Sequence, residues 1–404
     1  MNIFVGVLVG LFVLMTLVTL HELGHFIAAR RNGVRVLEFG IGFPPKAIAW
    51  VKDPKTEKWT RLPKQEWDKP QEGLIFSLNW LPIGGFCQMD GESAFDEREG
   101  TFGAASFLKK TKILFAGVAM NWLTAFVILT ILAWAGMPNF LEGQFTIDAD
   151  SRVERAPVEI TKVFEGSPAE KAGLSVGDYI LSVDGKEVKS GSEVIAYDSG
   201  HAGGDVTYEI CPNNNKNCGE ESSKITIRLN SSDDEYLLGI AMRSSESKTY
   251  STWSAPIVGA GLTLQITGET FKGVGQLVWN LVSGVGQLFS FDATVRENGQ
   301  AAISTVGDSV SGPVGIIGVL FPAFTSAGPA NLAFLAAIIS ISLACMNVLP
   351  IPALDGGRWL LIAIYKVRRK KLTKEVEEKI VARAFIVLLA LMFIVTILDI
   401  TRFF

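Results

Sequence analysis

The sequence has few charged residues, few cysteines and few histidines for its length. Of its 404 residues, 19% are charged, four are cysteine and three are histidine. Soluble domains carry about 25% charged residues, and small disulfide-stabilised scaffolds need a far higher share of cysteine. The formal net charge of −4 offers no basic surface, so we expect no nucleic-acid partner. A hydrophobic share of 48% instead favours a membrane protein with soluble parts.

Long segments without charge predict four transmembrane helices. They are residues 1–20, continuing in apolar character to Ala29; residues 113–137; residues 330–349, within the charge-free stretch 309–354; and residues 384–398, which need a further turn at each end. Each is near the length that crosses a bilayer as a helix. A cleaved signal peptide is the alternative for the first segment, but a basic start and a small-residue cleavage site are missing.

The basic residues predict the orientation of these helices. Residues 30–112 hold 14 Lys and Arg, and residues 358–383 hold nine, whereas residues 138–308 hold 13 against 24 Asp and Glu. Because basic residues near helix ends stay in the cytoplasm, the first two regions are expected inside and the acidic region outside. The polar stretch 52–72 is then a cytoplasmic loop. We expect a multi-pass protein of the cell membrane.

The acidic region contains a small β-rich domain. Alternating strand-like runs occupy residues 158–163, 179–183, 206–210 and 224–229, with turn residues between them. The stretch 166–185, GSPAEKAGLSVGDYILSVDG, closely resembles the core of a PDZ domain. The resemblance implies a groove for an extended peptide, such as a carboxy terminus, which we place at Ile160 and Val163. A β-rich spacer without a ligand is the alternative.

Two further features of this region stay open. Residues 253–289 carry widely spaced apolar residues among glycines, and we interpret them as an amphipathic segment on the outer membrane surface. A buried hairpin of helices is the competing interpretation. Cys211 and Cys218 bracket a hairpin tip, where either a disulfide or two free thiols are compatible with an outer location.

The strongest chemical motif is His21-Glu22-Leu-Gly-His25, at the end of the first apolar segment. On a helix, residues four apart point the same way, so both imidazoles can reach one Zn²⁺ ion. Glu22 is then placed to take a proton from metal-bound water as the general base. Ionisable residues inside a membrane helix are functional by default. The motif therefore predicts one catalytic zinc ion per chain.

Catalytic zinc takes three protein ligands, so a third must lie elsewhere in the chain. His201 lies in the PDZ-like region and is a poor candidate. Asp355 follows 46 residues without charge, in the motif NVLPIPALDGG. Its prolines open the helix, and a carboxylate at a broken membrane helix needs a partner. On spacing alone, an ordinary Asp-Gly-Gly surface turn is equally compatible with this segment.

Taken together, these motifs resemble the site-2 proteases, within them the bacterial RseP/RasP group of zinc metalloproteases with a single PDZ domain. HELGH in the first helix, a PDZ domain between the second and third, and NVLPIPALDGG after the third carry the resemblance. Supporting motifs are EFGIGF at 38–43, PIGGFCQMDGE at 82–92, AGVAMN at 116–121 and SGPVGI at 311–316. Phe86-Cys87-Gln88 and Gly117-Val118 depart from the usual family pattern, which leaves substrate choice open.

The resemblance implies a polytopic α-helical membrane protein with four transmembrane helices, a membrane-dipping β-hairpin and an extracytoplasmic PDZ domain. We expect an amino-terminal membrane half at 1–137, the PDZ domain at 155–245, the membrane-surface segment at 253–325 and a carboxy-terminal membrane half at 326–404. The implied zinc ligands are His21, His25 and Asp355, with Glu22 as base. Substrate handling is assigned to Asn347 and Pro350, and to the hairpin residues Ile83, Gly84, Gly85 and Phe86.

The implied activity is zinc-dependent cleavage of the transmembrane segments of other membrane proteins, for example an anti-sigma factor or a remnant signal peptide. About 20 residues precede His21, which at 1.5 Å per residue places the zinc about 30 Å from the outer end of the helix, near the cytoplasmic side. The alternative is a membrane-bound PDZ adaptor or chaperone without catalysis. An intact HELGH together with Asp355 argues against it.

Overall fold

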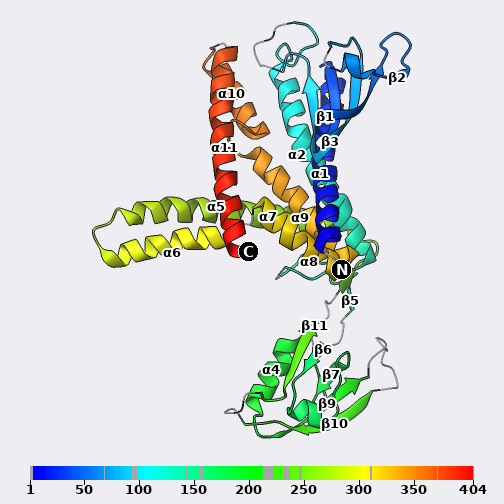
Figure 1. Ribbon diagram of the computed structural model, residues 1–404, viewed down its shortest axis with the longest axis vertical. Coiled ribbons are helices and arrows are strands. Elements are labelled where there is room, and N and C mark those ends of the chain that lie inside the picture. The colour runs from blue at the N-terminus through cyan, green and yellow to red at the C-terminus, as the bar shows by residue number, and fades with distance from the viewer. Residues whose placement is uncertain are drawn as a thin grey trace. The chain divides into compact units, whose positions relative to one another are not determined.

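The computed structural model describes residues 3–403 except 68, 93–95, 97, 142, 155–157, 189, 213–221, 232–233, 235, 245–247, 310–311 and 371. The chain divides into two compact units, Met1–Leu132 with Ala255–Phe404, and Ala133–Ser254 (Figure 1). Each unit is described separately below. The open question of whether Cys211 and Cys218 form a disulfide falls on residue 218, which lies outside the described part of the chain.

Four helices in the described residues are long and apolar enough to cross a membrane. They are α1 (Ile3–Arg31), α2 (Phe107–Ala135), α9 (Pro329–Val348) and α11 (Lys374–Phe403). Each of the four expected apolar segments lies in one of them. The fourth helix begins ten residues before the expected start at 384. The reason is that Val376 and Ile380, in its polar first turns, pack on a hydrophobic core that includes residues of α1 and α2.

The sequence sets the ends of these helices. At the end of α1, Gly33 has a φ of +80°, and the N–H of Val34 donates to the carbonyl of Ala29 at 2.9 Å, which satisfies a free carbonyl of the last turn. Pro329 opens α9 at a position where the missing N–H costs nothing. Pro350 follows two residues after α9 ends, since proline cannot continue the helix.

A three-stranded sheet connects α1 to α2. Its strands are β1 (Val36–Lys52), β2 (Trp59–Arg61) and β3 (Leu74–Met89), in the order β2-β1-β3, and the short helix η1 (Lys64–Glu66) follows β2. Residues 38–41 pair with both 85–88 and 75–78, while 75–78 also pair with 48–51, so the two long strands bend back and interleave. Residues 85–89 therefore form an outer edge of the sheet, and β3 lies against α1.

The described residues between the second unit and α9 are helical except for short connections, such as residues 289–292 and Gly328. It contains α5 (Ala255–Leu288), α6 (Ala293–Ser309), α7 (Pro313–Gly315), the π-helix η2 (Ile316–Leu320) and α8 (Phe321–Ala327). Helices α5 and α6 lie side by side as a hairpin (Figure 1). Fully buried Phe321 in α8 packs against Gly10 of α1. The last part of the expected surface segment 253–325 thus packs on α1, where Gly6 and Gly10 leave room for α8.

The second unit is built on a six-stranded sheet. Its strands are β6 (Val158–Val163), β7 (Tyr179–Val183), β8 (Lys186–Glu187), β9 (Asp205–Cys211), β10 (Ser223–Arg228) and β11 (Ile240–Ser244), with the order β10-β9-β7-β6-β11 and β8 beside β7. Helices α3 (Pro168–Lys171) and α4 (Gly191–Gly200) accompany it, and the short strands β4 (Met137–Pro138), β5 (Arg152–Glu154) and β12 (Lys248–Tyr250) form a separate small sheet. One hydrophobic core, including Ile180, Val206 and Tyr208, joins strands and helices.

The structure changes the expected position of the peptide groove. Ile160 is fully buried in the core, and β6, which also carries Val163, has β7 on one side and β11 on the other. A strand with two neighbours has no free edge for an added peptide. The outer strand on this side is β11, which contacts α4. Ile160 and Val163 thus lie on an inner strand, and β11 is the outer strand on this side of the sheet.

Candidate active site

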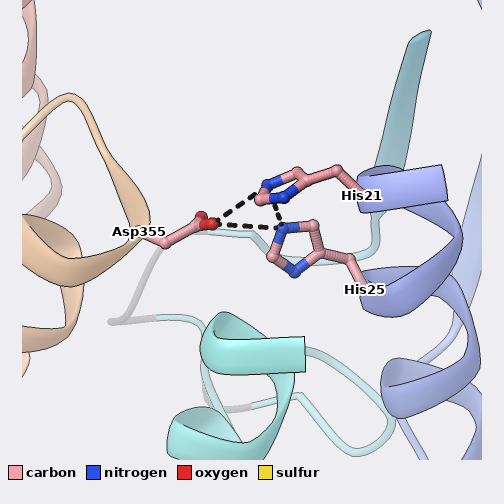
Figure 2. A group of neighbouring side chains, drawn as sticks. All are labelled: His21, His25 and Asp355. Carbon is pink, nitrogen blue, oxygen red and sulfur yellow. Dashed lines mark hydrogen bonds and ion pairs between the residues drawn. The ribbon is translucent and has the colours of Figure 1, made fainter. Parts of the chain in front are cut away.

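His21 and His25 lie one helical turn apart near the carboxy-terminal end of α1, and both side chains are buried. Their rings point to the same side of the helix, as Figure 2 shows. The two Nε2 atoms are 3.1 Å apart. The structure thus brings both imidazoles of the HELGH motif to one point, as the four-residue spacing predicts.

Asp355 reaches the same point from the first turn of α10 (Asp355–Val367). The two glycines that follow it allow this approach. A Cβ on Gly356 would lie 2.1 Å from the carbonyl oxygen of Val348, and one on Gly357 would lie 2.0 Å from that of Ile351. Only glycine lets the start of α10 lie this close to the end of α9, so the Asp-Gly-Gly sequence is needed to carry the carboxylate inward.

The three donor atoms form a nearly equilateral triangle. Oδ2 of Asp355 lies 3.2 Å from Nε2 of His21 and 3.3 Å from Nε2 of His25. Tetrahedral zinc with bonds of about 2.0 Å holds its ligand atoms about 3.3 Å apart. The Oδ2 atom is buried and has no hydrogen-bond partner among the described residues. Two nitrogens and one oxygen facing each other at this spacing fit a zinc ion.

Glu22 lies beside this triangle and is held by the β-sheet. Its carboxylate accepts a hydrogen bond from the backbone N–H of Cys87 in β3. Burial, with a smaller contribution from the Glu22 carboxylate, raises the pKa of the Cys87 thiol above its usual range. Cys87 is not one of the three clustered donor groups, which are His21, His25 and Asp355. The outer edge of the sheet therefore positions a carboxylate next to three metal-binding side chains.

A cavity of about 740 Å³ opens over these residues. His21, Glu22, His25 and Asp355 line it, together with Cys87 and Met89 of the sheet edge. The first turns of α11 close another side through residues that include Glu377, Val381 and Phe385. Its volume lies in the range of ligand-binding pockets, and Cys87 and Met89 at the edge of the sheet form part of one wall.

The residues expected to handle substrate are in different positions relative to this cavity. Asn347 lines it, whereas Pro350 is exposed in the turn between α9 and α10. In the hairpin, Gly84 and Gly85 are buried against Val18 and Thr19 of α1, while Ile83 is 62% exposed. Phe86 is half-buried, and its ring packs beside that of Phe43.

Several groups that support the site were not predicted from the sequence. The carbonyl of Ile113 accepts a hydrogen bond from Nδ1 of His25 at 2.8 Å, and the side chain of Asn121 lies 3.3 Å from Nδ1 of His21. Arg358, one turn after Asp355, pairs with Glu92 at 3.0 Å and with Glu377 at 3.6 Å. A backbone carbonyl leaves no trace in the sequence, but an asparagine in an otherwise apolar helix is a signal that could have been used.

The chain is similar to known zinc metalloproteases over nearly its whole length. A Clostridium perfringens protein, classed by name among the zinc metalloproteases, is 28% identical over 394 residues, which cover 98% of each chain. The regulator of sigma-W protease RasP of Bacillus subtilis is 25% identical, covering 96% of each chain. The zinc metalloprotease RasP of Shouchella clausii is also 25% identical, covering 96% of this chain and 97% of that protein.

A solved PDZ domain of the SdrC-like protein from Listeria monocytogenes is 26% identical over 22% of this chain and 92% of its own, with a TM-score of 0.19. The sequence profile described as Peptidase family M50 matches residues 9–63 and 58–392. The expected kinship with site-2 proteases and the expected zinc dependence are thereby confirmed. The chain belongs to peptidase family M50, the zinc-dependent site-2 proteases.

Proposed function

We propose that this protein cuts the transmembrane segments of other membrane proteins at a zinc ion held by His21, His25 and Asp355. The observation that carries the proposal is the triangle of donor atoms at 3.1, 3.2 and 3.3 Å, two of which lie on α1, a helix apolar enough to cross a membrane. Bound zinc supplies a polarised scissile carbonyl and a water molecule that ionises near neutral pH.

Glu22 acts as the general base in this proposal. It lies next to the triangle but on the adjacent side of α1, where it contacts the cavity without being one of the three clustered donors. Its carboxylate accepts the proton of the attacking water and passes it to the nitrogen of the leaving amine. The N–H of Cys87 fixes the carboxylate while it exchanges that proton.

The substrate enters as an extended segment. Helical carbonyls are already hydrogen-bonded, so a transmembrane helix must unwind before its peptide bond is exposed. The outer edge at residues 85–89 lies along the cavity and offers backbone groups to an unwound strand. Ile83, Gly84, Gly85 and Phe86 then position this edge against α1, and the Asn347 amide supplies a polar contact from α9. Pro350 ends α9 so that the chain can turn toward Asp355.

Charge favours an inner location for the zinc site and an outer one for the PDZ-like unit. Arg30 and Arg31 end α1 a few residues after His25, and basic residues near helix ends stay in the cytoplasm. The site then lies near the cytoplasmic side of the cell membrane. Extracytoplasmic peptide carboxy termini are the ligands proposed for the β11 edge. By analogy with the family, an anti-sigma factor or a remnant signal peptide is the substrate class.

The decisive test compares the wild-type protein with Glu22→Gln, both purified at full length in lipid nanodiscs with a single-pass substrate. Wild type should cleave within the membrane segment, and Glu22→Gln should bind about one zinc ion per chain but not cleave, because it loses the base and keeps the ligands. Glu269→Gln, an exposed glutamate of α5, is the matched control and should cleave normally. Substantial cleavage by Glu22→Gln, or no zinc in wild type, would refute the proposal.

A further inference from the structure

A backbone carbonyl determines which ring nitrogen of neutral His25 carries the proton. Its Nδ1 lies 2.8 Å from the carbonyl oxygen of Ile113, which can only accept a hydrogen bond. Nδ1 therefore carries the proton, and the lone pair of the neutral ring lies on Nε2, which faces the other two donors of the triangle. A metal-binding histidine needs this arrangement, with its second nitrogen donating to a fixed acceptor.

His21 needs an equivalent acceptor at its own Nδ1, because its Nε2 also faces the triangle. The group at that position is the side-chain amide of Asn121, 3.3 Å away and 100 residues along the chain. Asn121 is fully buried, and its Oδ1 has no hydrogen-bond partner among the described residues. Leaving a buried amide oxygen unpaired is destabilising, so this oxygen is expected to accept a hydrogen bond.

The oxygen and nitrogen of an Asn side-chain amide lie in one plane and are nearly the same size, so a half-turn of the amide exchanges their positions. Exchanging the oxygen and nitrogen of Asn121 turns the unpaired Oδ1 toward Nδ1 of His21, where it accepts the N–H of the ring. With the nitrogen there instead, Nδ1 would have to accept, and the proton would sit on Nε2, which the metal requires free. The chemistry of the triangle therefore selects the oxygen.

Two features of helix α2 place the Asn121 amide next to the His21 ring. The Ser340 hydroxyl of α9 donates to the backbone carbonyl of Asn121 at 2.9 Å, with both residues fully buried. One turn earlier, Gly117 presents no side chain, and a Cβ there would lie 2.7 Å from Nε2 of His21. The helix thus makes room for the imidazoles at one position and supplies a polar group four residues later, on the same face.

We propose that Asn121 is a positioning residue that accepts the Nδ1 proton of His21 and thereby fixes the ring with its Nε2 lone pair directed at the zinc. The inference rests on the proposed zinc ligation by His21. Loss of such an outer hydrogen bond weakens metal affinity by about 10- to 100-fold in other zinc proteins. The same loss is expected here when the acceptor is removed.

The test measures zinc affinity of the full-length protein by competition with a chelator, and the absorption bands of bound cobalt(II). Asn121→Leu, which removes the acceptor at similar size, should weaken zinc binding about 10- to 100-fold, and Asn121→Ala should do the same if the leucine variant does not fold. Asn121→Asp retains an acceptor oxygen and should stay close to wild type in both readouts. Glu269→Gln, at an exposed position of α5 away from the site, should also bind like wild type.

Two results would overturn the inference: zinc affinity of Asn121→Leu and Asn121→Ala equal to that of wild type, or Asn121→Asp as weak as Asn121→Leu. The second would mean that size and packing matter and that the acceptor does not. Failure of the proposed function looks different, because the wild-type protein itself would then lack stoichiometric zinc.

Discussion

Gly117 of α2 leaves the space that His25 of α1 occupies: a Cβ on Gly117 would lie 2.5 Å from the Nε2 atom of the imidazole. The two helices approach closely here. At the residue before His25, a Cβ on Gly24 would lie 2.3 Å from the carbonyl oxygen of Ala116. Small residues on both helices let their backbones pack at this distance in a membrane, and the rings of His21 and His25 fill the remaining gap.

Gly117→Ala should therefore displace both histidines. We expect it to lower zinc affinity and to destabilise the helical unit by about 1 to 3 kcal/mol, the usual cost of overpacking. Gly268→Ala is the matched control, because nothing lies within 4 Å of a Cβ at that helical position. Alanine there should be neutral or stabilising by up to about 1 kcal/mol. Chelator competition and thermal unfolding of both proteins check this, and equal behaviour of the two variants would contradict it.

Asp355 and Glu22 should respond differently to substitution although both line the cavity. Asp355→Ala removes a proposed ligand and should lower both zinc affinity, by more than about 100-fold, and cleavage, since even outer-shell losses cost about 10- to 100-fold. Glu22→Gln should lower cleavage alone. Zinc content after dialysis at a fixed free zinc concentration separates the two. Tight, full occupancy in Asp355→Ala would leave the carboxylate a structural role only.

The sidedness of the soluble parts can be tested by cysteine labelling in intact cells, with the four native cysteines replaced. Ser192→Cys, Lys64→Cys and Lys370→Cys all place the thiol at exposed positions. An impermeant maleimide should label Ser192→Cys at once, but the other two only after the membrane is broken, because basic flanks stay inside. Labelling of Lys370→Cys from outside would reverse the orientation.

The apolar patterns of the sequence were sufficient to locate the membrane helices, since a charge-free run of about 20 residues has few other stable states. They could not give the length of α11, whose polar first turns are helical because Val376 and Ile380 pack on a distant core. The interleaved pairing of residues 38–41 with both 75–78 and 85–88 also depends on contacts far apart in the chain. Period-two alternation alone does not specify such a register.

For the site, local spacing predicted that His21 and His25 share a face, because the helix enforces it. Spacing alone left Asp355 undecided between a ligand and a turn, and the structure brings its carboxylate within 3.3 Å of both rings. For the peptide groove, the strand-like run at Ile160 predicted a strand but not its neighbours. The position of β6 between β7 and β11 depends on pairing with residues distant in the chain.

The second unit should lose stability as the pH rises from about 4 to about 6. Burial raises the pKa of Asp198 to about 6, although the Tyr208 hydroxyl, donating at 2.6 Å, opposes this. The folded unit thus holds a proton that the unfolded chain releases near the ordinary pKa of 3.8. The contribution of Asp198 to the free energy of unfolding is greatest below about pH 4. It falls by about 1 to 3 kcal/mol by about pH 6, since each pKa unit corresponds to about 1.4 kcal/mol. The pH dependence of this stability can be measured by urea-dependent proteolysis within residues 150–250 of the full-length protein. Asp198→Asn, which still accepts from Tyr208, should flatten this slope; an unchanged slope would assign it to other groups.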